Sequence, residues 1–361
     1  MQISNNLSAN LINQHIVLAM PSSYTVTGLF KAFEDLKVLI LGDVMIDAYL
    51  FGNVERISPE APVPIVAVHK RKNLLGGAAN VALNVKALGA TPLMCSVIGN
   101  DNQGDEFLKL LTEQGLRQDG ICRSESRVTT TKFRVIGNKM QMLRIDEETE
   151  SDLNENESKR YLDKIKNIIT TEKVDVIIFE DYNKGVLTAE VISYVIALAN
   201  KQGIPTSVDP KKKNFDQYCN VTLFKPNLKE LREGLKVEVN PQDKDSLSSA
   251  LDLLQIRQNV KIAMTTLSEH GVFIRAVNHD ESIDCHHISA HLRSITDVSG
   301  AGDTVISVAS LCLALHQDSK LIASLSNLAG GLVCEHVGVV PINRELLIKE
   351  SRMFLEDQFT H

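Results

Sequence analysis

The sequence predicts an α/β fold in which a mostly parallel sheet is flanked by helices and carries a small β lid. Short apolar runs alternate with longer helical patterns from Leu36 onward, which is typical of βαβ units. The chain has 361 residues, 43% of them hydrophobic, so it can bury a substantial core. Two segments, at about 47–72 and 128–146, break the alternation and indicate the lid. We therefore expect an extension over 1–35, one domain over 36–346 and a tail over 347–361.

The strands of the main sheet are predicted from short apolar runs bounded by polar or turn-forming residues. They are Val38–Leu41, Leu93–Ile98, Val174–Phe179, Thr206–Val208, Val221–Phe224, Ile262–Thr265 and Val272–Ala276. The best-defined helices each end at a glycine, which readily adopts the left-handed conformation found at helix C-termini. These helices are Ala79–Leu88 before Gly89, Glu106–Gln114 before Gly115, and Ala189–Gln202 before Gly203.

The lid is predicted from antiparallel signals. Thr129–Ile136 and Met140–Ile145 flank the turn-forming residues 137–139, as in a hairpin. The stretch Asp47–Lys72 alternates apolar and polar residues but carries Pro59, Pro62 and Pro64. Because proline cannot donate to a strand ladder, we expect this stretch to form edge strands or extended connections.

Composition and charge exclude several classes of protein. With 38 basic and 45 acidic residues the net charge is -7, which offers no broad positive surface for nucleic acid, although a local basic cluster could still bind phosphate. The six scattered cysteines form no C-x-x-C pair and fit a reducing cytoplasm. Residues 1–30 lack charge and the features of an export signal, and no apolar run is long enough to span a membrane.

Polar residues follow several predicted strands. They are Asp43, Asp181, Asp209 and Asn227. In open α/β sheets ligands bind beyond the carboxyl ends of the strands, so these side chains are expected to converge on one site. Helix capping and turn formation explain any single member equally well, but explain the whole set less well.

The segment Thr296–Thr304 is the most informative for chemistry. Gly300 and Gly302 lie where a loop enters a long apolar helix, so backbone N–H groups and the helix dipole would stabilise a transferring phosphoryl group. Asp303 is then placed to take a proton from an incoming hydroxyl. The alternative is a glycine turn with an aspartate that caps a core helix. A Walker A loop is excluded because the sequence contains no Gly-Lys dipeptide.

A second glycine-rich segment, Gly76–Asn80, opens a helix and would let a ligand approach the backbone, unless it serves only tight helix packing. Asn80 can both donate to and accept from a sugar hydroxyl. Cationic residues that could hold a phosphate lie on the predicted hairpin and after Asp181, although each alone could be a solvated surface charge. They are Lys132, Arg134, Lys139, Arg144 and Lys184.

With these motifs in order, the chain from about Leu36 to Leu346 resembles the ribokinase-like, or PfkB-type, carbohydrate kinases. Gly76–Asn80 is similar to the first signature of that family and Asp297–Asp303 to the second. Within the family the chain looks most like the heptose-phosphate kinases of ADP-heptose synthesis. The segments that carry this closer likeness are Leu41–Asp47, Arg56–Pro64, Leu143–Asp146, Asp181–Leu187 and Lys225–Asn227.

The resemblance implies ATP- and Mg²⁺-dependent phosphorylation of the anomeric hydroxyl of D-glycero-β-D-manno-heptose 7-phosphate, giving the 1,7-bisphosphate for ADP-heptose and lipopolysaccharide core synthesis. It also implies a homodimer built through the lid. Many relatives carry a nucleotidyltransferase domain after the kinase, and since this sequence ends at His361 we expect another protein to supply that step.

Carried over position by position, the resemblance assigns roles to individual residues. Asp303 would be the base, with Gly300, Ala301 and Gly302 as the anion hole. The substrate side would comprise Asp43, Asp47, Gly76, Gly77, Asn80, Arg144, Asp181 and Lys184. The nucleotide side would comprise Asn227, Glu230, Thr266, Ser268, Gly271 and Asn327. Asp297 and Ser299 are similar to residues beside a monovalent-cation site, such as one for K⁺, that some members use.

Two other functions stay open on the sequence. One is a kinase for another sugar or sugar phosphate, because the fold does not determine the substrate. The other is a sensor that binds sugar or nucleotide without turnover. The presence of Asp303 with both Gly300 and Gly302 argues against the sensor, since a degenerate site would have lost one of them.

Overall fold

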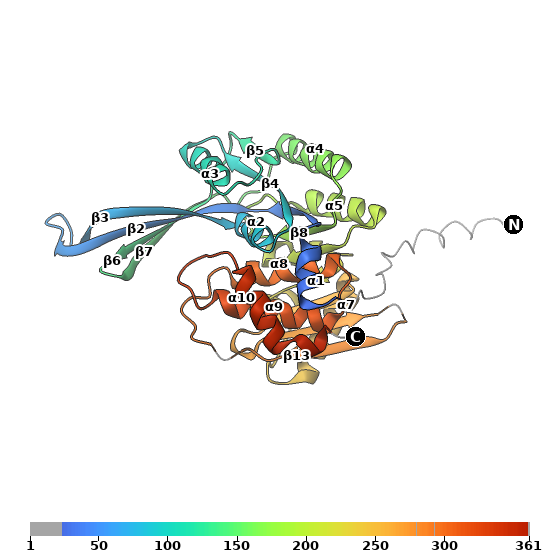
Figure 1. Ribbon diagram of the computed structural model, residues 1–361. Coiled ribbons are helices and arrows are strands. Elements are labelled where there is room, and N and C mark those ends of the chain that lie inside the picture. Colours follow the sequence, from blue (N-terminus) through green and yellow to red (C-terminus); the bar gives the residue numbers. More distant parts are fainter. Residues whose placement is uncertain (1–23, 279, 292, 360–361) are drawn as a thin grey trace.

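A nine-stranded sheet forms the centre of the computed structural model, which describes residues 24–278, 280–291 and 293–359 (Figure 1). Its strand order is β13-β12-β11-β10-β9-β8-β1-β4-β5, and all pairs from β11 to β5 are parallel. The strands are β1 (Lys37–Gly42), β4 (Thr91–Gly99), β5 (Ile121–Ser124), β8 (Val176–Glu180), β9 (Thr206–Asp209), β10 (Leu223–Phe224), β11 (Ile262–Thr266), β12 (Val272–Val277) and β13 (Ile283–Ile288). The last two are antiparallel, and β5 and β13 have no counterpart among the predicted strands.

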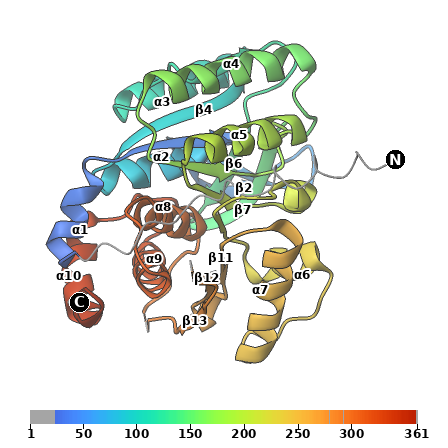
Figure 2. The ribbon, with the colours of Figure 1, turned by 90° about the vertical axis from the view of Figure 1, so that its right-hand side faces the viewer.

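Helices cover both faces of this sheet, as Figure 2 shows. Successive residues of β1 point to opposite faces, so Val38 and Ile40 join one core while Leu39 and Leu41 join the other. The first core receives α1 (Val26–Phe33), α2 (Ala78–Ala87), α3 (Asn102–Glu113), α8 (Ala301–Ala314), α9 (Ser319–Val333) and α10 (Arg344–Phe354). The second receives α4 (Glu155–Thr171), α5 (Ala189–Gln202), α6 (Leu228–Leu235) and α7 (Lys244–Gln258). Among the helices of the described residues, none is long and apolar enough to span a bilayer.

The lid is a separate four-stranded sheet, ordered β3-β2-β6-β7, that projects away from the helices (Figure 1). It consists of β2 (Val44–Ile57), β3 (Pro64–Gly77), β6 (Thr131–Gly137) and β7 (Met140–Glu147). Asn138 and Lys139 turn β6 into β7 with φ of 51° and 67°, as a tight hairpin requires.

The prediction that proline confines 47–72 to edge strands or connections is wrong for β2. This strand pairs with both β3 and β6 and is an interior strand of the lid. The prolines do not interrupt it, because Pro59 and Pro62 lie in the loop between β2 and β3 and Pro64 begins β3.

Both ends of the described chain pack into the first core, although we expected an extension over 1–35 and a tail over 347–361. Residues 1–23 lie outside the described residues, but Val26, Leu29, Phe30 and Phe33 line one buried face of α1. This i, i+3, i+4, i+7 pattern is an amphipathic helix signal. The guanidinium of Arg344 on α10 donates to the Phe30 carbonyl at 2.9 Å, which joins the two ends.

Candidate active site

Polar groups from β8, β9 and the start of α8 meet at the carboxyl edge of the main sheet. Carboxylate oxygens of Glu180, Asp209 and Asp303 all lie within 4.8 Å of one another, and all three residues are buried. We call these three residues the carboxylate cluster. The sequence analysis placed Asp209 and Asp303 at this edge but missed Glu180. A charged residue that directly ends the apolar run 176–179 was the available signal.

The turn before α8 brings backbone close to this cluster. Gly300 precedes the first residue of the helix with φ of 79°, in the left-handed region that favours glycine. At Gly302 a Cβ atom would stand 3.4 Å from Asp209 Oδ2 and 3.8 Å from Lys225 Nζ. The first N–H groups of a helix lack intrahelical acceptors and carry partial positive charge, so the 300–302 segment can hold an anion here.

Asp303 is held by two neutral donors. The Asn80 amide donates to Oδ2 at 2.6 Å, and the Tyr182 hydroxyl donates to Oδ1 at 2.9 Å. Burial raises the pKa of Asp303, and Asp209 adds to this, while the two donors and Lys225 act in the opposite direction. A carboxylate with one donor on each oxygen keeps lone pairs to accept a proton.

Lys225 is a buried cation of this region, and its ammonium lies 2.8 Å from Asp209 Oδ2. Burial alone would lower the pKa of Lys225, but Asp209, Glu230 and Glu180 outweigh burial and raise it. For Glu180, burial raises the carboxyl pKa well above its usual range, and the charges of Asp209 and Asp303 raise it further.

The carboxylate cluster fits a Mg²⁺ ion. Glu180 Oε2 is buried and has no hydrogen-bond partner among the described residues, so it is an oxygen that a cation would satisfy. Hard carboxylate oxygens are the ligands that Mg²⁺ prefers. Asp209 and Glu180 are therefore the residues that would hold it.

Asp43 and Asp181, predicted on the substrate side, have their oxygens occupied by protein donors. The Asp43 carboxylate accepts the backbone N–H groups of Tyr182, Lys184 and Val186 at 2.8, 3.1 and 3.1 Å. Asp181 accepts from the Asn183 backbone, the Asn214 amide and the Tyr218 hydroxyl. Burial, with the charge of Asp43, raises the pKa of Asp181 to about 6. Both carboxylates thus fix the 182–186 loop, which carries Tyr182.

Asp47 lies where the lid joins the main domain. Its carboxylate pairs with Arg134 of β6, and a Cβ at Gly76 would stand 2.6 Å from Asp47 Oδ2. Gly77 has φ of 61°, so both positions of this glycine pair serve the close approach of β2, β3 and α2. Arg134 also lies over the Tyr49 ring at 5.3 Å, so a cation is fixed on the lid beside Asp47.

The two cations predicted beside the substrate lie in different surroundings. Arg144 on β7 pairs with Asp146 at 2.9 Å, but 53% of its side chain is exposed. Lys184 is largely buried, and its ammonium lies between Glu148 and Glu150 at 2.8 and 2.9 Å. Lys184 is therefore neutralised by two carboxylates, whereas Arg134 and Arg144, each paired with one carboxylate, share one face of the lid as cross-strand partners.

On the predicted nucleotide side, Asn227 and Glu230 form a capping box that begins α6. Thr266, the last residue of β11, pairs with Asn227 as an isolated parallel bridge, so these residues lie together at the carboxyl ends of β10 and β11. Ser268 and Gly271 have φ of 54° and 86° in the turn that follows. Asn327 of α9 was also predicted on the nucleotide side. Its side-chain amide donates to the Ser289 carbonyl at 2.9 Å.

Asp297 ties the turn before α8 to the 336–342 loop. One of its oxygens accepts from the Ser299 backbone and hydroxyl at 3.0 and 2.8 Å, and the other accepts from the Gly338 backbone at 2.8 Å. Burial acts to raise the pKa of Asp297, but these hydrogen bonds prevail and lower it. These hydrogen bonds therefore favour the ionised form of Asp297.

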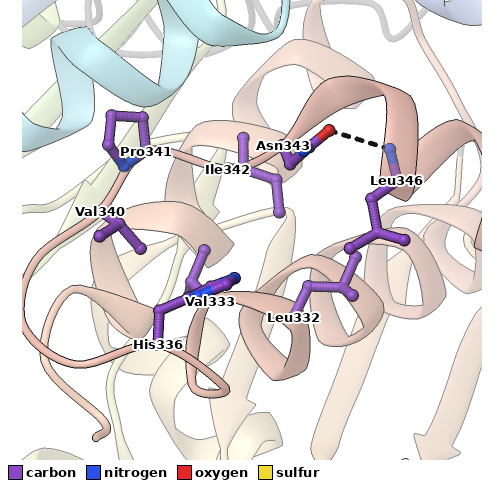
Figure 3. A pocket seen from close by; sticks show the side chains of 8 residues that line it. All are labelled: Leu332, Val333, His336, Val340, Pro341, Ile342, Asn343 and Leu346. Carbon is purple, nitrogen blue, oxygen red and sulfur yellow. Dashed lines mark hydrogen bonds between the residues drawn. The ribbon is translucent and has the colours of Figure 1, made fainter.

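Behind the same loop lies an apolar cavity of about 250 Å³ (Figure 3). Its lining residues are Leu332, Val333, His336, Val340, Pro341, Ile342, Asn343 and Leu346. The lining has no carboxylate and no lysine or arginine, so this cavity is unsuited to phosphoryl transfer. The carboxylate cluster contains the charged groups that this cavity lacks.

A parallel sheet with a glycine turn beside a buried aspartate, and a lid that continues from the carboxyl end of β1, defines an α/β phosphotransferase for a small hydroxyl-bearing substrate. Residues 35–345 match the model of the pfkB family carbohydrate kinases, so the chain belongs to this family and is an ATP-dependent sugar kinase. This confirms the resemblance and the enzyme class predicted from the sequence.

Two curated relatives are called bifunctional protein HldE. The protein from Sulfurimonas denitrificans is 38% identical over 87% of this chain, and that from Helicobacter pylori J99 is 37% identical over 84%. The match spans 64% and 63% of their lengths, so the chain corresponds to somewhat under two thirds of each relative.

Solved structures confirm the predicted fold class. Phosphofructokinase-2 from Escherichia coli, in complex with potassium, superimposes with a TM-score of 0.72 at 17% identity, over 90% of this chain and 99% of that one. A putative ribokinase from Agrobacterium tumefaciens gives a TM-score of 0.67 at 17% identity, over 89% and 99%. The fold is therefore ribokinase-like.

Proposed function

We propose that this kinase phosphorylates the anomeric hydroxyl of D-glycero-β-D-manno-heptose 7-phosphate with ATP, giving the 1,7-bisphosphate and ADP. The observation that carries the proposal is the juxtaposition of Asp303 with the glycine turn at residues 300–302. The heptose phosphate is favoured over other sugars by the segments Arg56–Pro64 and Asp181–Leu187, and by the similarity to proteins called HldE.

In this mechanism Asp303 takes the proton of the attacking hydroxyl while the hydroxyl oxygen bonds to the γ-phosphorus of ATP. The bond from that phosphorus to the bridging oxygen breaks, and ADP leaves with the electron pair. The N–H groups of Gly300 and Gly302 and the Lys225 ammonium are proposed to stabilise the charge that develops on the phosphoryl oxygens, while the Ala301 N–H donates to the Val298 carbonyl. A Mg²⁺ ion held by Asp209 and Glu180 would supply charge neutralisation on the ATP phosphates.

Asp47 and Asn80 are proposed to bind sugar hydroxyls, with Arg134 and Arg144 of the lid near the 7-phosphate. The residues proposed to lie beside ATP are Asn227, Glu230, Thr266, Ser268, Gly271 and Asn327. Asp297 and Ser299 are proposed to flank a monovalent cation. We further propose a homodimer through the lid, because β7 exposes Met140, Met142, Leu143 and Ile145 to solvent. The proposed site of action is the cytoplasm.

The test is a panel of sugar phosphates with ATP and Mg²⁺, scored by ADP release. We expect turnover to be fastest with the heptose 7-phosphate. Faster turnover of fructose 6-phosphate or ribose would overturn the substrate but leave the kinase class intact. Tight binding of ATP and sugar without turnover of any member would contradict the catalytic assignment of this site.

A further inference from the structure

Tyr182 touches the proposed base but was not recognised from the sequence. Its hydroxyl donates to Asp303 Oδ1 at 2.9 Å, while Asn80 donates to the other oxygen. A carboxyl group held by a single hydrogen bond can still rotate about its Cβ–Cγ bond. With one donor on each oxygen, the plane of the Asp303 carboxylate and the direction of its remaining lone pairs are fixed.

The Tyr182 side chain is itself held in place from several directions. Its backbone N–H donates to Asp43 at 2.8 Å, and the next residue, Asn183, has φ of 56° in a turn closed by Asp181. The Lys211 ammonium lies over the phenol ring at 5.4 Å and pairs with Glu230. A phenol anchored in this way is pre-organised, so its hydroxyl is held within hydrogen-bonding distance of Asp303.

The charges around Asp303 explain why a neutral donor is useful at this point. Glu180 and Asp209 repel its carboxylate, and the nearby Lys225 ammonium is paired with Asp209. An ammonium group bound to Asp303 would compete with the substrate hydroxyl for the lone pairs of the carboxylate. The phenol orients the carboxylate through one lone pair without adding a competing charge.

We propose that Tyr182 is a positioning residue for phosphoryl transfer, whose hydroxyl aims the Asp303 carboxylate at the acceptor hydroxyl of the sugar. This inference rests on the proposed role of Asp303 as the base. It also gives Asp43 and Asp181 a function in the reaction, since they hold the loop from which Tyr182 reaches Asp303.

The test compares Tyr182→Phe with Tyr161→Phe in the full chain, using ATP, Mg²⁺ and the best substrate of the panel. Tyr161 is the matched control because it is a fully buried tyrosine on α4 whose hydroxyl donates to the Cys95 carbonyl at 2.9 Å, away from Asp303. Tyr182→Phe should lower kcat about 10- to 100-fold, since misorientation of a reacting group has effects of this size, while KM for sugar and ATP stays within about threefold. Tyr161→Phe should lower the melting temperature and leave kcat unchanged.

A double-substitution cycle with Asp303→Asn separates positioning from a structural role. If Tyr182 acts through Asp303, adding Tyr182→Phe to Asp303→Asn should cost no further turnover. A full additional loss in the double variant, or a kcat of Tyr182→Phe within about threefold of the parent, would overturn the inference. If Asp303→Asn alone leaves turnover unchanged, it is the proposed base that fails.

Discussion

The main sheet and the outer strand β7 of the lid place their polar residues in opposite environments. At the edge of the main sheet, Glu180, Asp209, Lys225 and Asp303 are at most 5% exposed, and most of their polar atoms have protein partners. On the lid, every residue of β7 is exposed. The difference teaches that the proposed reaction chemistry lies on buried groups fixed by protein contacts, whereas the outer strand of the lid can change its contacts at little cost in stability. Substrate preference can therefore vary on the lid while the reaction stays the same.

The largest effect is expected at Asp43, which belongs to the buried edge of the main sheet. Asp43→Ala removes the acceptor for three backbone N–H groups. Because each unsatisfied buried donor costs about 1–3 kcal/mol, we expect the free energy of unfolding to fall by roughly 3 kcal/mol or more. Denaturant titration measures this loss. Asp43→Asn keeps one acceptor oxygen and should lose less, and equal stability of all three proteins would show that the loop is not held as described.

Gly302→Ala probes the backbone that faces the proposed phosphoryl position. The added methyl group would contact Asp209 Oδ2 at 3.4 Å, which the fold tolerates, but it would occupy space next to Lys225 that a phosphoryl group needs. We expect kcat to fall about 10²-fold, comparable to the loss of an oxyanion donor, with little change in melting temperature. Gly203→Ala is the control for turnover alone, because a Cβ there meets nothing within 4 Å at the C-terminal end of α5, although the left-handed φ of 70° should lower the melting temperature. If both variants keep parental turnover, the 300–302 segment is no anion hole.

On the lid, removal of a cation should affect one substrate only. Arg134→Ala and Arg144→Ala should each raise KM for the phosphorylated sugar, by up to about tenfold, and leave KM for ATP unchanged, because a charge-assisted phosphate contact contributes about 1.5–3 kcal/mol before solvent screening. Lys184→Ala should have a smaller effect, since Glu148 and Glu150 already neutralise its ammonium. Initial-rate kinetics with each substrate varied separately decide this. Equal losses for both substrates would indicate structural ion pairs.

The smallest expected effect concerns the apolar surface of β7. Leu143→Glu together with Ile145→Glu should shift a lid-mediated dimer toward monomer, because both side chains are about half exposed and carry no charge. The stability of the protomer should change little. Ile256→Glu, on the 73% exposed Ile256 of α7, is the matched control. Sedimentation velocity measures the oligomeric state, and an unchanged sedimentation coefficient for the lid variant would rule out this interface.

Much of the main sheet could be predicted because its signals are local. The predicted strand Val38–Leu41 lies within β1, and the predicted helix Ala189–Gln202 is α5 to the residue, with Gly203 in the left-handed conformation at φ of 70°. The β6–β7 hairpin followed from turn-forming residues at its tip. The antiparallel pairing of β12 and the position of the short β5 could not be predicted, because pairing direction depends on contacts distant in sequence.

The candidate site was predictable by position but not by contact. The strand-end rule located Asp43, Asp181 and Asp209, yet it could not tell a carboxylate that caps a loop, such as Asp43, from one that faces the site, such as Asp209. That distinction depends on which backbone N–H groups surround each oxygen. Tyr182 was missed for the same reason. Its proposed role depends on a hydrogen bond to Asp303, which lies 121 residues further along the sequence.

The measurement that most directly tests the central claim, that Asp303 is the base, is turnover of Asp303→Asn on a preparation whose melting temperature and ATP affinity are also measured. The Asn amide can accept from Asn80 and donate to the Tyr182 hydroxyl, whose proton can rotate, so the fold should be retained. The account predicts a fall in turnover of about 10²- to 10⁴-fold with stability and ATP affinity near those of the parent. Turnover within about threefold of the parent would contradict it.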